Sequence, residues 1–410
     1  MVDDPRMRGF RSRTAVEDVI TLIDQRVGAG AAERVALDDA RERVLADDVI
    51  ATVNVPAFAR SAMDGYAVVA EQTFGATPDD PREFAVADES LPAKPAAASV
   101  TAKECVRIMT GAPLPEGADA VVPVEMTAAA GDDRVNVTGA VTPGQHVGAI
   151  GEDIATGDRV LERGRRLRAQ DLGVCSSIGE AELNVVTRPR VAVLITGNEI
   201  LPPGSKPSGH SIVDANSPML RALIERDGGV ALKTFRVEDN VAALSGALLA
   251  AVKSAKCVLV SGGTSVGAED HMPKLVAKAG ELIVHGVAMR PSSPAGLGFV
   301  KETPVFLLPG NPVSCLCAYD FFAGRAIRRL GGLPEDFPHE QRRLPLERKI
   351  ASQLGRTDYV RVRIENDRVV PLAIRGASRL SSTTRADGFV IVPAALEGYA
   401  EGDKVTVRLY

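Results

Sequence analysis

The sequence predicts a multidomain protein of the α/β plus β class. Between residues 188 and 332, short apolar runs alternate with amphipathic helical patterns, which is typical of a parallel sheet covered by helices. On either side of this region, short alternating segments separated by Pro and Gly turns predict antiparallel β structure. At 410 residues the chain is too long for one ordinary core, so about three domains are expected.

The N-terminal region predicts two helices. Thr14 and Glu17 have the spacing of a capping box, so the first helix is expected over residues 16–27, with Gly28 as its stop. A shorter helix is expected over residues 38–45. Because residues 16–27 are amphipathic, we expect no secretory signal, and no apolar run approaches the ~20 residues of a membrane span.

Residues 80–150 predict a compact β-rich domain with many turns. Within it, residues 78–98 are rich in Ala, Pro and Asp and are expected to form a surface loop. The preceding segment, residues 54–68, breaks every regular period and carries Asp64 before Gly65. This pair is open to two interpretations: a simple turn, or a carboxylate presented on a constrained loop. Glu152 and Asp153 are likewise typical of a solvated turn.

Three strand-to-loop junctions mark the α/β region. The expected strand over residues 190–195 ends in Thr196-Gly197-Asn198-Glu199. A second apolar run, residues 257–260, is followed by a glycine-rich stretch, and a third, residues 305–308, by Pro309-Gly310-Asn311-Pro312. Ligands of open α/β sheets bind at the carboxyl ends of the strands. We therefore expect the three junctions to converge on one crevice.

The glycine-rich stretch, residues 261–270, suggests phosphate chemistry. Its glycines permit a tight turn and expose backbone N–H groups to an anion, and Glu269 and Asp270 close it. A nest of N–H groups with a carboxylate at its edge indicates phosphate together with a metal ion. A plain glycine-rich connection between a strand and a helix is the alternative.

The remaining pattern completes the layout. Asn216 is expected to cap a helix that has Pro218 in its first turn, and Asn240, with the acids before it, to cap the next helix, residues 241–252. Gly331 and Gly332 end the last helix of the α/β region. Residues 340–410 alternate strictly in several runs and predict a small antiparallel β-sandwich or barrel.

Composition excludes several classes of function. A net charge of −5, no Trp and only 4% aromatic residues give no basis for binding nucleic acid or an anionic membrane. Five cysteines without a Cys-x-x-Cys pair argue against a disulfide framework or a structural zinc site. We expect reduced, mostly buried thiols in a cytoplasmic protein.

Six motifs follow one another along nearly the whole chain. They are Ser61-Ala62-Met63-Asp64-Gly65-Tyr66-Ala67, Met109-Thr110-Gly111-Ala112-Pro113, Gly151-Glu152-Asp153-Ile154, Thr196-Gly197-Asn198-Glu199, Ser261-Gly262-Gly263-Thr264-Ser265-Val266-Gly267 and Leu308-Pro309-Gly310-Asn311-Pro312-Val313-Ser314. Together they resemble the molybdopterin molybdotransferases, the MoeA-type molybdenum insertases whose relatives include the E domain of gephyrin.

The resemblance implies a fold of four domains. These are a discontinuous helical linking domain (1–50 and 145–187), a β-rich domain (51–144), a three-layer α/β molybdopterin-binding domain (188–332) and a C-terminal small β-barrel (340–410). It also implies a homodimer in which the site lies between the α/β domain of one subunit and the β domain of its partner. Molybdopterin adenylyltransferase and molybdoenzyme apoproteins are the further partners that it suggests.

The implied activity is insertion of molybdate into adenylylated molybdopterin with release of AMP, assisted by Mg²⁺. The positions that match the family's catalytic residues are Asp64, Thr110, Asp153, Glu199, Asp239 and Asp270, of which Glu199 and Asp270 suit the metal. The positions that match its substrate-binding residues are Gly262, Gly263, Ser265, Gly267, Arg290, Pro309, Gly310, Asn311, Pro312 and Ser314.

The chain departs from the family pattern at three positions. Asn198 stands where an acid is frequent, Ser293 replaces the second base of the loop that starts at Arg290, and Gly286 replaces a lysine. Lys274, Lys301 or an arginine of a partner subunit could compensate for the lost bases. The alternatives are a scaffold that keeps the fold with weakened insertase activity, a molybdopterin adenylyltransferase, or a hydrolase of free dinucleotides that shares the α/β domain.

Overall fold

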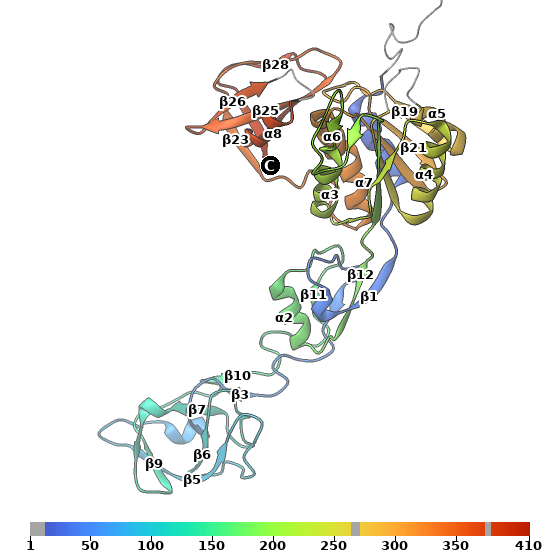
Figure 1. The fold of residues 1–410 in the computed structure, drawn as a ribbon. Coiled ribbons are helices and arrows are strands. Elements are labelled where there is room, and N and C mark those ends of the chain that lie inside the picture. The colour runs from blue at the N-terminus through green and yellow to red at the C-terminus, as the bar shows by residue number, and fades with distance from the viewer. Residues whose placement is uncertain (1–12, 264–270, 374–378) are drawn as a thin grey trace, which may run out of the picture. The chain divides into compact units, whose positions relative to one another are not determined.

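The computed structural model describes residues 13–263, 271–373 and 379–410, which form two compact units (Figure 1). The α/β unit comprises Met1–Glu33, Arg43–Ala46 and Asn184–Tyr410. The β unit comprises Arg34–Glu42 and Asp47–Leu183. No helix within the described residues is long and apolar enough to cross a membrane.

The β unit is built on a mixed six-stranded sheet. In spatial order its strands are β7 (Ala120–Pro123), β4 (Gly65–Val68), β6 (Glu104–Ile108), β5 (Arg82–Ser90), β9 (Arg134–Val137) and β8 (Thr127–Ala129). Only β5 and β6 run parallel to each other; the other neighbours are antiparallel. The core beneath the sheet includes Phe84, Val122 and Val137.

Short elements complete the β unit. Two small antiparallel ladders join β2 (Val49–Ile50) to β11 (Arg159–Leu161) and β3 (Arg60–Ser61) to β10 (Val147–Gly148). The described part of the unit also contains helix α2 (Ala169–Ser177) and the short 3₁₀ turns η2 (Leu37–Asp39), η3 (Ala70–Thr73) and η4 (Val124–Met126). The strands β1 (Ala32–Ala36) and β12 (Glu182–Val186) form a two-stranded sheet.

The α/β unit contains a seven-stranded sheet. The order along it is β16 (Val230–Ala231), β13 (Arg190–Thr196), β18 (Cys257–Ser261), β22 (Thr303–Leu308), β21 (Gly296–Val300) and β19 (Glu281–His285), with β17 (Phe235–Val237) also paired to β13. The strands from β16 to β22 are parallel, whereas β21 and β19 are antiparallel. Antiparallel edge strands on a parallel sheet are common in such folds.

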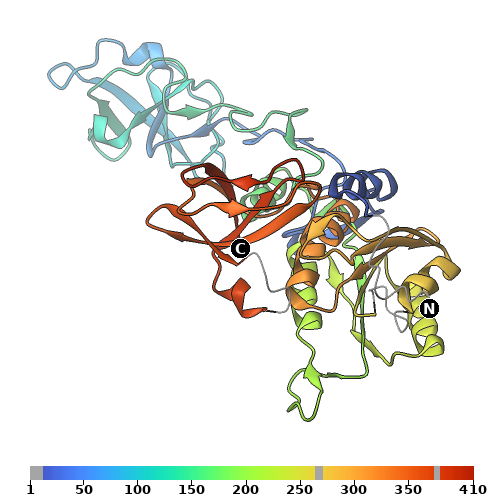
Figure 2. The ribbon, with the colours of Figure 1, turned by 90° about the horizontal axis from the view of Figure 1, so that it is seen from above.

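Helices cover both faces of this sheet, which confirms the predicted three layers. One face packs on α4 (Val241–Ser254) and α5 (Met272–Ala279) through Leu244 and Met272. The other packs on α1 (Val16–Arg26), α3 (Asn216–Arg226), α6 (Pro312–Ala318), the π-helical turn η5 (Tyr319–Ala323) and α7 (Gly324–Leu330). An arm formed by β14 (Ile200–Leu201) and β15 (Ile212–Val213) projects from the end of the layers (Figure 2).

The C-terminal strands form a second, smaller β core. Their order is β20 (Met289–Arg290), β25 (Thr357–Glu365), β27 (Gly388–Val392), β29 (Lys404–Leu409) and β23 (Gln341–Pro345), with β26 (Arg368–Ala373) on β25. A separate pair joins β24 (Ile350–Ala351) to β28 (Gly398–Tyr399), and α8 (Ser381–Thr384) is a single turn. Val360, Val390 and Val407 lie in the core. The alternating runs predicted from the sequence therefore are strands.

Three local predictions are wrong. Residues 38–45 form no α-helix: after η2 the backbone at Glu42 turns to φ 63°, and Val186 donates its N–H to the carbonyl of Val44 at 2.7 Å. Residues 78–98 are not all loop, because β5 pairs on both sides. Thr14 does not cap α1: it bridges Val287 instead, and no side chain caps that helix.

The five cysteines are buried and unbridged, as predicted. Burial in apolar surroundings raises the pKa of Cys105 and Cys315 to about 12, so both stay protonated at neutral pH. They behave as small apolar side chains rather than as reactive thiols.

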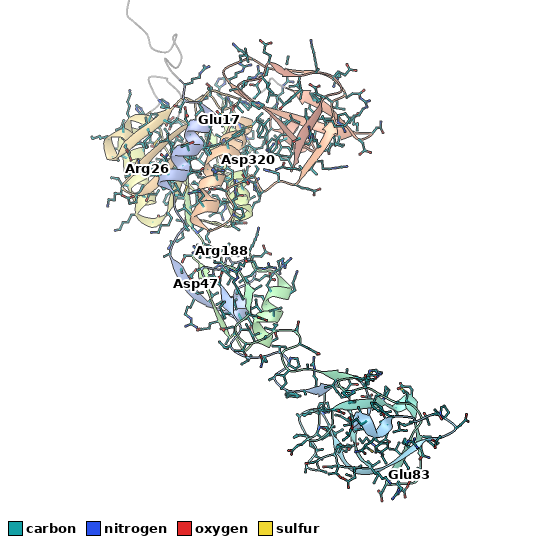
Figure 3. The ribbon with its side chains drawn as sticks, turned by 180° about the vertical axis from the view of Figure 1, so that it is seen from behind. Glu17, Arg26, Asp47, Glu83, Arg188 and Asp320 are labelled. Carbon is teal, nitrogen blue, oxygen red and sulfur yellow. The ribbon has the colours of Figure 1, made fainter. Side chains whose placement is uncertain are left out.

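A buried charge network joins the helical layer to the C-terminal strands. Asp227 accepts from Arg226 and Arg328, each at 2.9 Å, and Asp320 accepts from Arg226 at 2.9 Å. The hydroxyl of Tyr359, on β25, donates to Asp320 at 3.3 Å. Figure 3 shows Asp320 on the helical layer beside these strands. The two carboxylates lie almost out of contact with solvent, at 0% and 1% exposure, so their charge is balanced by the arginines alone.

Replacement of Asp227 by alanine is expected to lower the free energy of unfolding of the α/β unit by about 3–5 kcal/mol, because Arg328 then loses its carboxylate in a buried site. Denaturant unfolding of the variant would measure this change. The matched control is Glu347→Ala, which removes an exposed ion pair to Arg368 and should cost about 1 kcal/mol or less. Equal losses in the two variants would contradict the importance of the buried network.

Candidate functional site

Three loops begin at one edge of the large sheet. In the parallel register, Ser261 of β18 lies opposite Ile195 of β13 and Leu308 of β22. The loops that follow these strands, starting at Gly197, Gly262 and Pro309, therefore leave the sheet side by side. The three junctions therefore start at one edge of the sheet, as predicted, while residues 264–270 of the second loop lie outside the described residues.

Gly262 is required by this arrangement. Its φ is +97°, and a Cβ at this position would lie 2.3 Å from the carbonyl oxygen of Thr196. Any side chain would thus be strained and would collide with the end of β13. A Cβ on Gly310 would lie 3.6 Å from the Cα of Gly262, so the second and third loops touch. The backbone of Gly310 therefore lies next to that of Gly262, and Gly263 follows Gly262 in the same turn.

One side chain joins these loops and was not predicted to do so. Asn216 donates from Nδ2 to the hydroxyl of Ser261 and to the carbonyl of Gly310, each at 2.8 Å. Its predicted role as helix cap is wrong, because α3 begins at Asn216 and Asp214 accepts the N–H of Ser217 at 2.9 Å. The presence of Asp214 two residues earlier was the signal that another residue could cap the helix.

Acidic and amide groups border the glycine turns. Thr196 pairs with Val237 of β17, so Glu199 and Asp239 follow neighbouring strands. The N–H of Asp239 donates to the Asn198 amide oxygen at 3.1 Å. A Cβ on Gly263 would lie 3.8 Å from Oδ1 of Asp239. The predicted Asn240 cap of α4 is confirmed, since its side chain accepts the N–H of Ala243, and this fixes the loop that carries Asp239.

These oxygen groups suit a magnesium ion that is completed by a phosphate. Within the described residues there is no group of three or more His, Cys, Asp or Glu side chains that could hold a metal. Mg²⁺ in nucleotide sites needs only one or two carboxylates, with phosphate oxygens and water as the other ligands. Glu199, which is exposed, and Asp239 supply such carboxylates. Ser265, Gly267 and Asp270 lie outside the described residues.

In the β unit, Asp64 is held by Thr110. Its Oδ1 accepts the backbone N–H of Thr110 at 2.6 Å and the hydroxyl at 2.7 Å. These two bonds, the backbone one first, keep the pKa of the Asp64 carboxyl below its ordinary value. Gly65 is not part of a simple turn: it begins β4, and a Cβ there would lie 2.0 Å from the carbonyl oxygen of Val122. The constrained-loop interpretation of Asp64 is the one that fits.

Asp153 belongs to a segment that pairs with the residues preceding Asp64. The segment around Asp153 pairs with residues 55–61, which lead to Asp64: Val147 lies opposite Ser61, and Ile154 bridges Val55. Asp153 therefore lies near Val55, at the start of residues 55–61, whereas Asp64 follows their end. The side chains of Asp64 and Asp153 are both exposed.

Comparison with known proteins places this geometry in context. Three family models match: the MoeA N-terminal region (domain I and II) over residues 14–179, a probable molybdopterin binding domain over residues 192–329, and the MoeA C-terminal region (domain IV) over residues 343–410. Molybdopterin molybdenumtransferase 2 of Mycobacterium tuberculosis is 35% identical over 385 residues, which is 91% of this chain and 94% of that protein. The chain belongs to the MoeA family.

Two further members of the family are similar over most of their length. A putative molybdopterin biosynthesis protein of Methanocaldococcus jannaschii is 34% identical over 386 residues, covering 92% of each chain. The crystal structure of a molybdopterin biosynthesis MoeA protein from Pyrococcus horikoshii superposes with a TM-score of 0.86 at 30% identity, covering 97% of this chain and 99% of that one. The similarity therefore extends through both compact units.

The loop that departs from the MoeA pattern is anchored twice. Arg290 forms an ion pair with Asp358, which forms a second ion pair with Nε of Arg356 at 3.1 Å and accepts a hydrogen bond from the hydroxyl of Ser352 at 2.9 Å. Two guanidinium groups thus share one buried carboxylate and leave a surplus of one positive charge. Sequence reasoning missed Arg356, whose position beside Arg290 depends on the parallel pairing of Arg290 with Asp358.

Ser292 provides the second anchor of this loop. Its φ is 89°, which is uncommon for a residue other than glycine. The side chain is buried, and its hydroxyl donates to the carbonyl oxygen of Ser314 in α6 at 2.5 Å. This bond ties the loop to the start of α6, where Asn311 is the N-cap residue and Pro312 the first helical residue.

Replacement of Thr110 by valine should raise the pKa of Asp64, because the hydroxyl donor to its carboxylate is lost while the backbone donor remains. Since hydrogen bonds hold the folded-state pKa down, the carboxyl of the variant takes up its proton at a higher pH than in the wild type. Titration of ¹³C-labelled aspartate carboxyls by NMR would follow it. Thr127→Val is the control, because that hydroxyl donates only to a backbone carbonyl; an unchanged Asp64 pKa in Thr110→Val would contradict the assignment.

Proposed function

We propose that this MoeA-family protein is a molybdopterin molybdotransferase, a transferase that inserts molybdate into adenylylated molybdopterin and releases AMP. The observation that carries the proposal is the meeting of three loops at one sheet edge, with bare glycine backbone at the centre and carboxylates at the border. Breaking a phosphoanhydride requires positioned donors and neutralisation of phosphate charge, and these are the groups present.

The backbone surface is assigned to the phosphates and the pterin. Glycine residues let phosphate oxygens approach the N–H groups closely, which a Cβ would prevent. The loop before α6 lies against the same surface and adds its own backbone groups. The proposed substrate-binding residues are Gly262, Gly263, Ser265, Gly267, Pro309, Gly310, Asn311, Pro312 and Ser314.

The carboxylates Glu199 and Asp270 are assigned to Mg²⁺, with Asp239 beside them. Bound there, the ion would neutralise charge on the phosphate oxygens of the substrate. The loop that carries Asp239 is fixed at both sides: Asn240 caps α4 directly after Asp239, and Asn198 accepts the N–H of Asp239.

Arg290 and Arg356 are assigned to the incoming molybdate, which is a dianion. They share Asp358, so the pair carries a surplus positive charge although the second base of the loop has been replaced by Ser293. The guanidinium group suits oxyanions because its donors form a planar fork. Arg356 thereby takes the compensating role that we considered for Lys274, Lys301 or a partner-subunit arginine.

We further propose that the site is completed in a homodimer, where Asp64, Thr110 and Asp153 come from the β domain of the partner. The hydrogen bonds from Thr110 keep Asp64 ionised, as required of a carboxylate that orients molybdate or accepts a proton. The four-domain division at residues 50, 145, 188 and 340 belongs to this proposal. So do a cytoplasmic location, and contact with molybdopterin adenylyltransferase and with molybdoenzyme apoproteins.

Replacement of Glu199 or Asp270 by alanine should lower the rate of AMP release from adenylylated molybdopterin and molybdate by about 10²-fold or more, because charge stabilisation at the phosphate is lost. The melting temperature should stay within a few degrees of the wild type. Glu238→Ala is the matched control, since this exposed acid lies next to Asp239 on the same loop. A wild type that releases no AMP at any molybdate concentration would instead support a scaffold role.

Replacement of Arg356 by glutamine should raise the molybdate concentration needed for half-maximal AMP release by about tenfold, because one charged donor is worth roughly 1.5–3 kcal/mol. The dependence on adenylylated molybdopterin should change little. Arg348→Gln, which removes an exposed arginine of the same C-terminal region, serves as the control. Unchanged molybdate dependence in Arg356→Gln would remove this residue from the proposed site.

A further inference from the structure

One buried polar group beside the three loops is not explained by the fold. Asn216 is 8% exposed, and its Oδ1 atom has no hydrogen-bond partner among the described residues. The start of α3 does not need this side chain, because Asp214 accepts both the N–H and the hydroxyl of Ser217. Buried polar atoms are nearly always paired in folded proteins. The Oδ1 atom therefore requires a partner from elsewhere.

The orientation of the amide is fixed by its other contacts. Nδ2 donates one hydrogen to Ser261 and the other to the carbonyl of Gly310. A carbonyl oxygen can only accept, so the NH₂ group must face Gly310, and the flipped amide would set two acceptors against each other. With both hydrogens used, Oδ1 presents an acceptor away from Gly310.

The same bond sets the direction of a backbone donor. The peptide between Gly310 and Asn311 is trans, and in a trans peptide the C=O and N–H groups point in opposite directions. By holding the Gly310 carbonyl, Asn216 directs the N–H of Asn311 away from itself. Its other hydrogen holds Ser261, the residue before the Gly262 turn. One side chain thus fixes the spacing of two loops and the aim of one donor.

A second buried group lies across the glycine turn. The hydroxyl of Thr196 has no partner among the described residues, and Thr196 is 2% exposed. A Cβ on Gly262 would lie 2.9 Å from it. Two polar atoms without partners therefore border the same turn, one from the end of β13 and one from the start of α3. This is the pattern of a site that is completed by a ligand.

We propose that Asn216 is a positioning residue that also selects the substrate: it holds the Ser261 and Gly310 turns at their spacing, and its Oδ1 accepts a hydrogen bond from an N–H or O–H group of the ligand. This inference rests on the proposed function. An acceptor cannot bind ionised phosphate oxygens, so the donor belongs to the pterin or to the adenylate part of the substrate. The glycine backbone and Asn216 thus recognise different portions of one molecule.

The test compares AMP release by the wild type, Asn216→Ala and Ser217→Ala as a function of adenylylated molybdopterin concentration. Asn216→Ala should raise KM by about 10- to 100-fold, with a smaller change in kcat, because both loop spacing and a ligand bond are lost. Ser217→Ala perturbs the same helix start without touching the crevice and should leave KM unchanged. Equal KM in all three proteins, or equal increases in both variants, would overturn the inference.

Asn216→Asp adds a pH dependence of KM that would not be expected if Asn216 had only a structural role. In the ionised variant, the carboxylate oxygen that replaces Nδ2 faces the Gly310 carbonyl, and the negative charge repels the substrate phosphates. KM should therefore be high at neutral pH. A protonated carboxyl can donate to that carbonyl as the amide does. KM should therefore fall toward the wild-type value as the pH is lowered, and a pH-independent KM would contradict the proposed bond. This variant also serves if Asn216→Ala fails to fold.

Calorimetric titration with AMP shows whether the donor to Oδ1 belongs to the adenylate or to the pterin. It also distinguishes failure of the Asn216 inference from failure of the proposed function. Weaker AMP binding by Asn216→Ala places the donor on the adenylate; unchanged AMP binding with a raised KM for the full substrate places it on the pterin. If the wild type releases no AMP, the proposed function fails, and AMP affinity still decides the role of Asn216. Equal AMP affinity in wild type and variant, or no binding by either, would then overturn it.

Discussion

The register of three parallel strands, β13, β18 and β22, is the constraint on which the candidate site depends. Side chains alternate between the two faces of a sheet, so a slip of one residue would exchange every inward and outward position. In the observed register Ser261 lies on the face of α3, within reach of Asn216, whereas Thr196 lies on the opposite face beside the Gly262 turn. The polar groups of the crevice are therefore fixed by the apolar pairing below them. Val193, Leu259 and Phe306 pack in one core cluster on that side of the sheet.

The sequence predicted the elements whose own residues determine them. Apolar runs predicted the buried strands and the three layers, and alternating runs predicted the C-terminal strands. Both predictions work because the spacing of apolar residues along a segment reflects which of its faces is buried. The failures have a tertiary cause. Residues 38–45 have a helical pattern, but the carbonyl of Val44 accepts the N–H of Val186, which belongs to another segment. The Ala- and Pro-rich stretch before residue 98 contains a strand because two neighbours pair with it.

The candidate site was predictable where a motif carries its own geometry and not where distant residues meet. Gly262 and Asn240 were assigned correctly from local chemistry, namely the demand for positive φ and the demand for a helix cap. Asn216 has the same local signature as a cap, and only the nearby Asp214 and the distant Gly310 show its different use. Arg356 carries no sequence signal at all. Arg356 follows Arg290 by 66 positions in the chain. The two come together because Met289 and Arg290 pair with Thr357 and Asp358.

Asp358 gives the proposed oxyanion-binding loop a built-in competitor. Its carboxylate already accepts a hydrogen bond from Nη2 of Arg290 at 2.5 Å and is itself 0% exposed, with Arg356 and Ser352 as further partners. An incoming anion must share the guanidinium groups with this resident charge, and any weakening of the Arg290 contact is felt on β25, the central strand of the C-terminal sheet. By thermodynamic linkage, occupancy of the loop and cohesion of the neighbouring β core influence each other reciprocally.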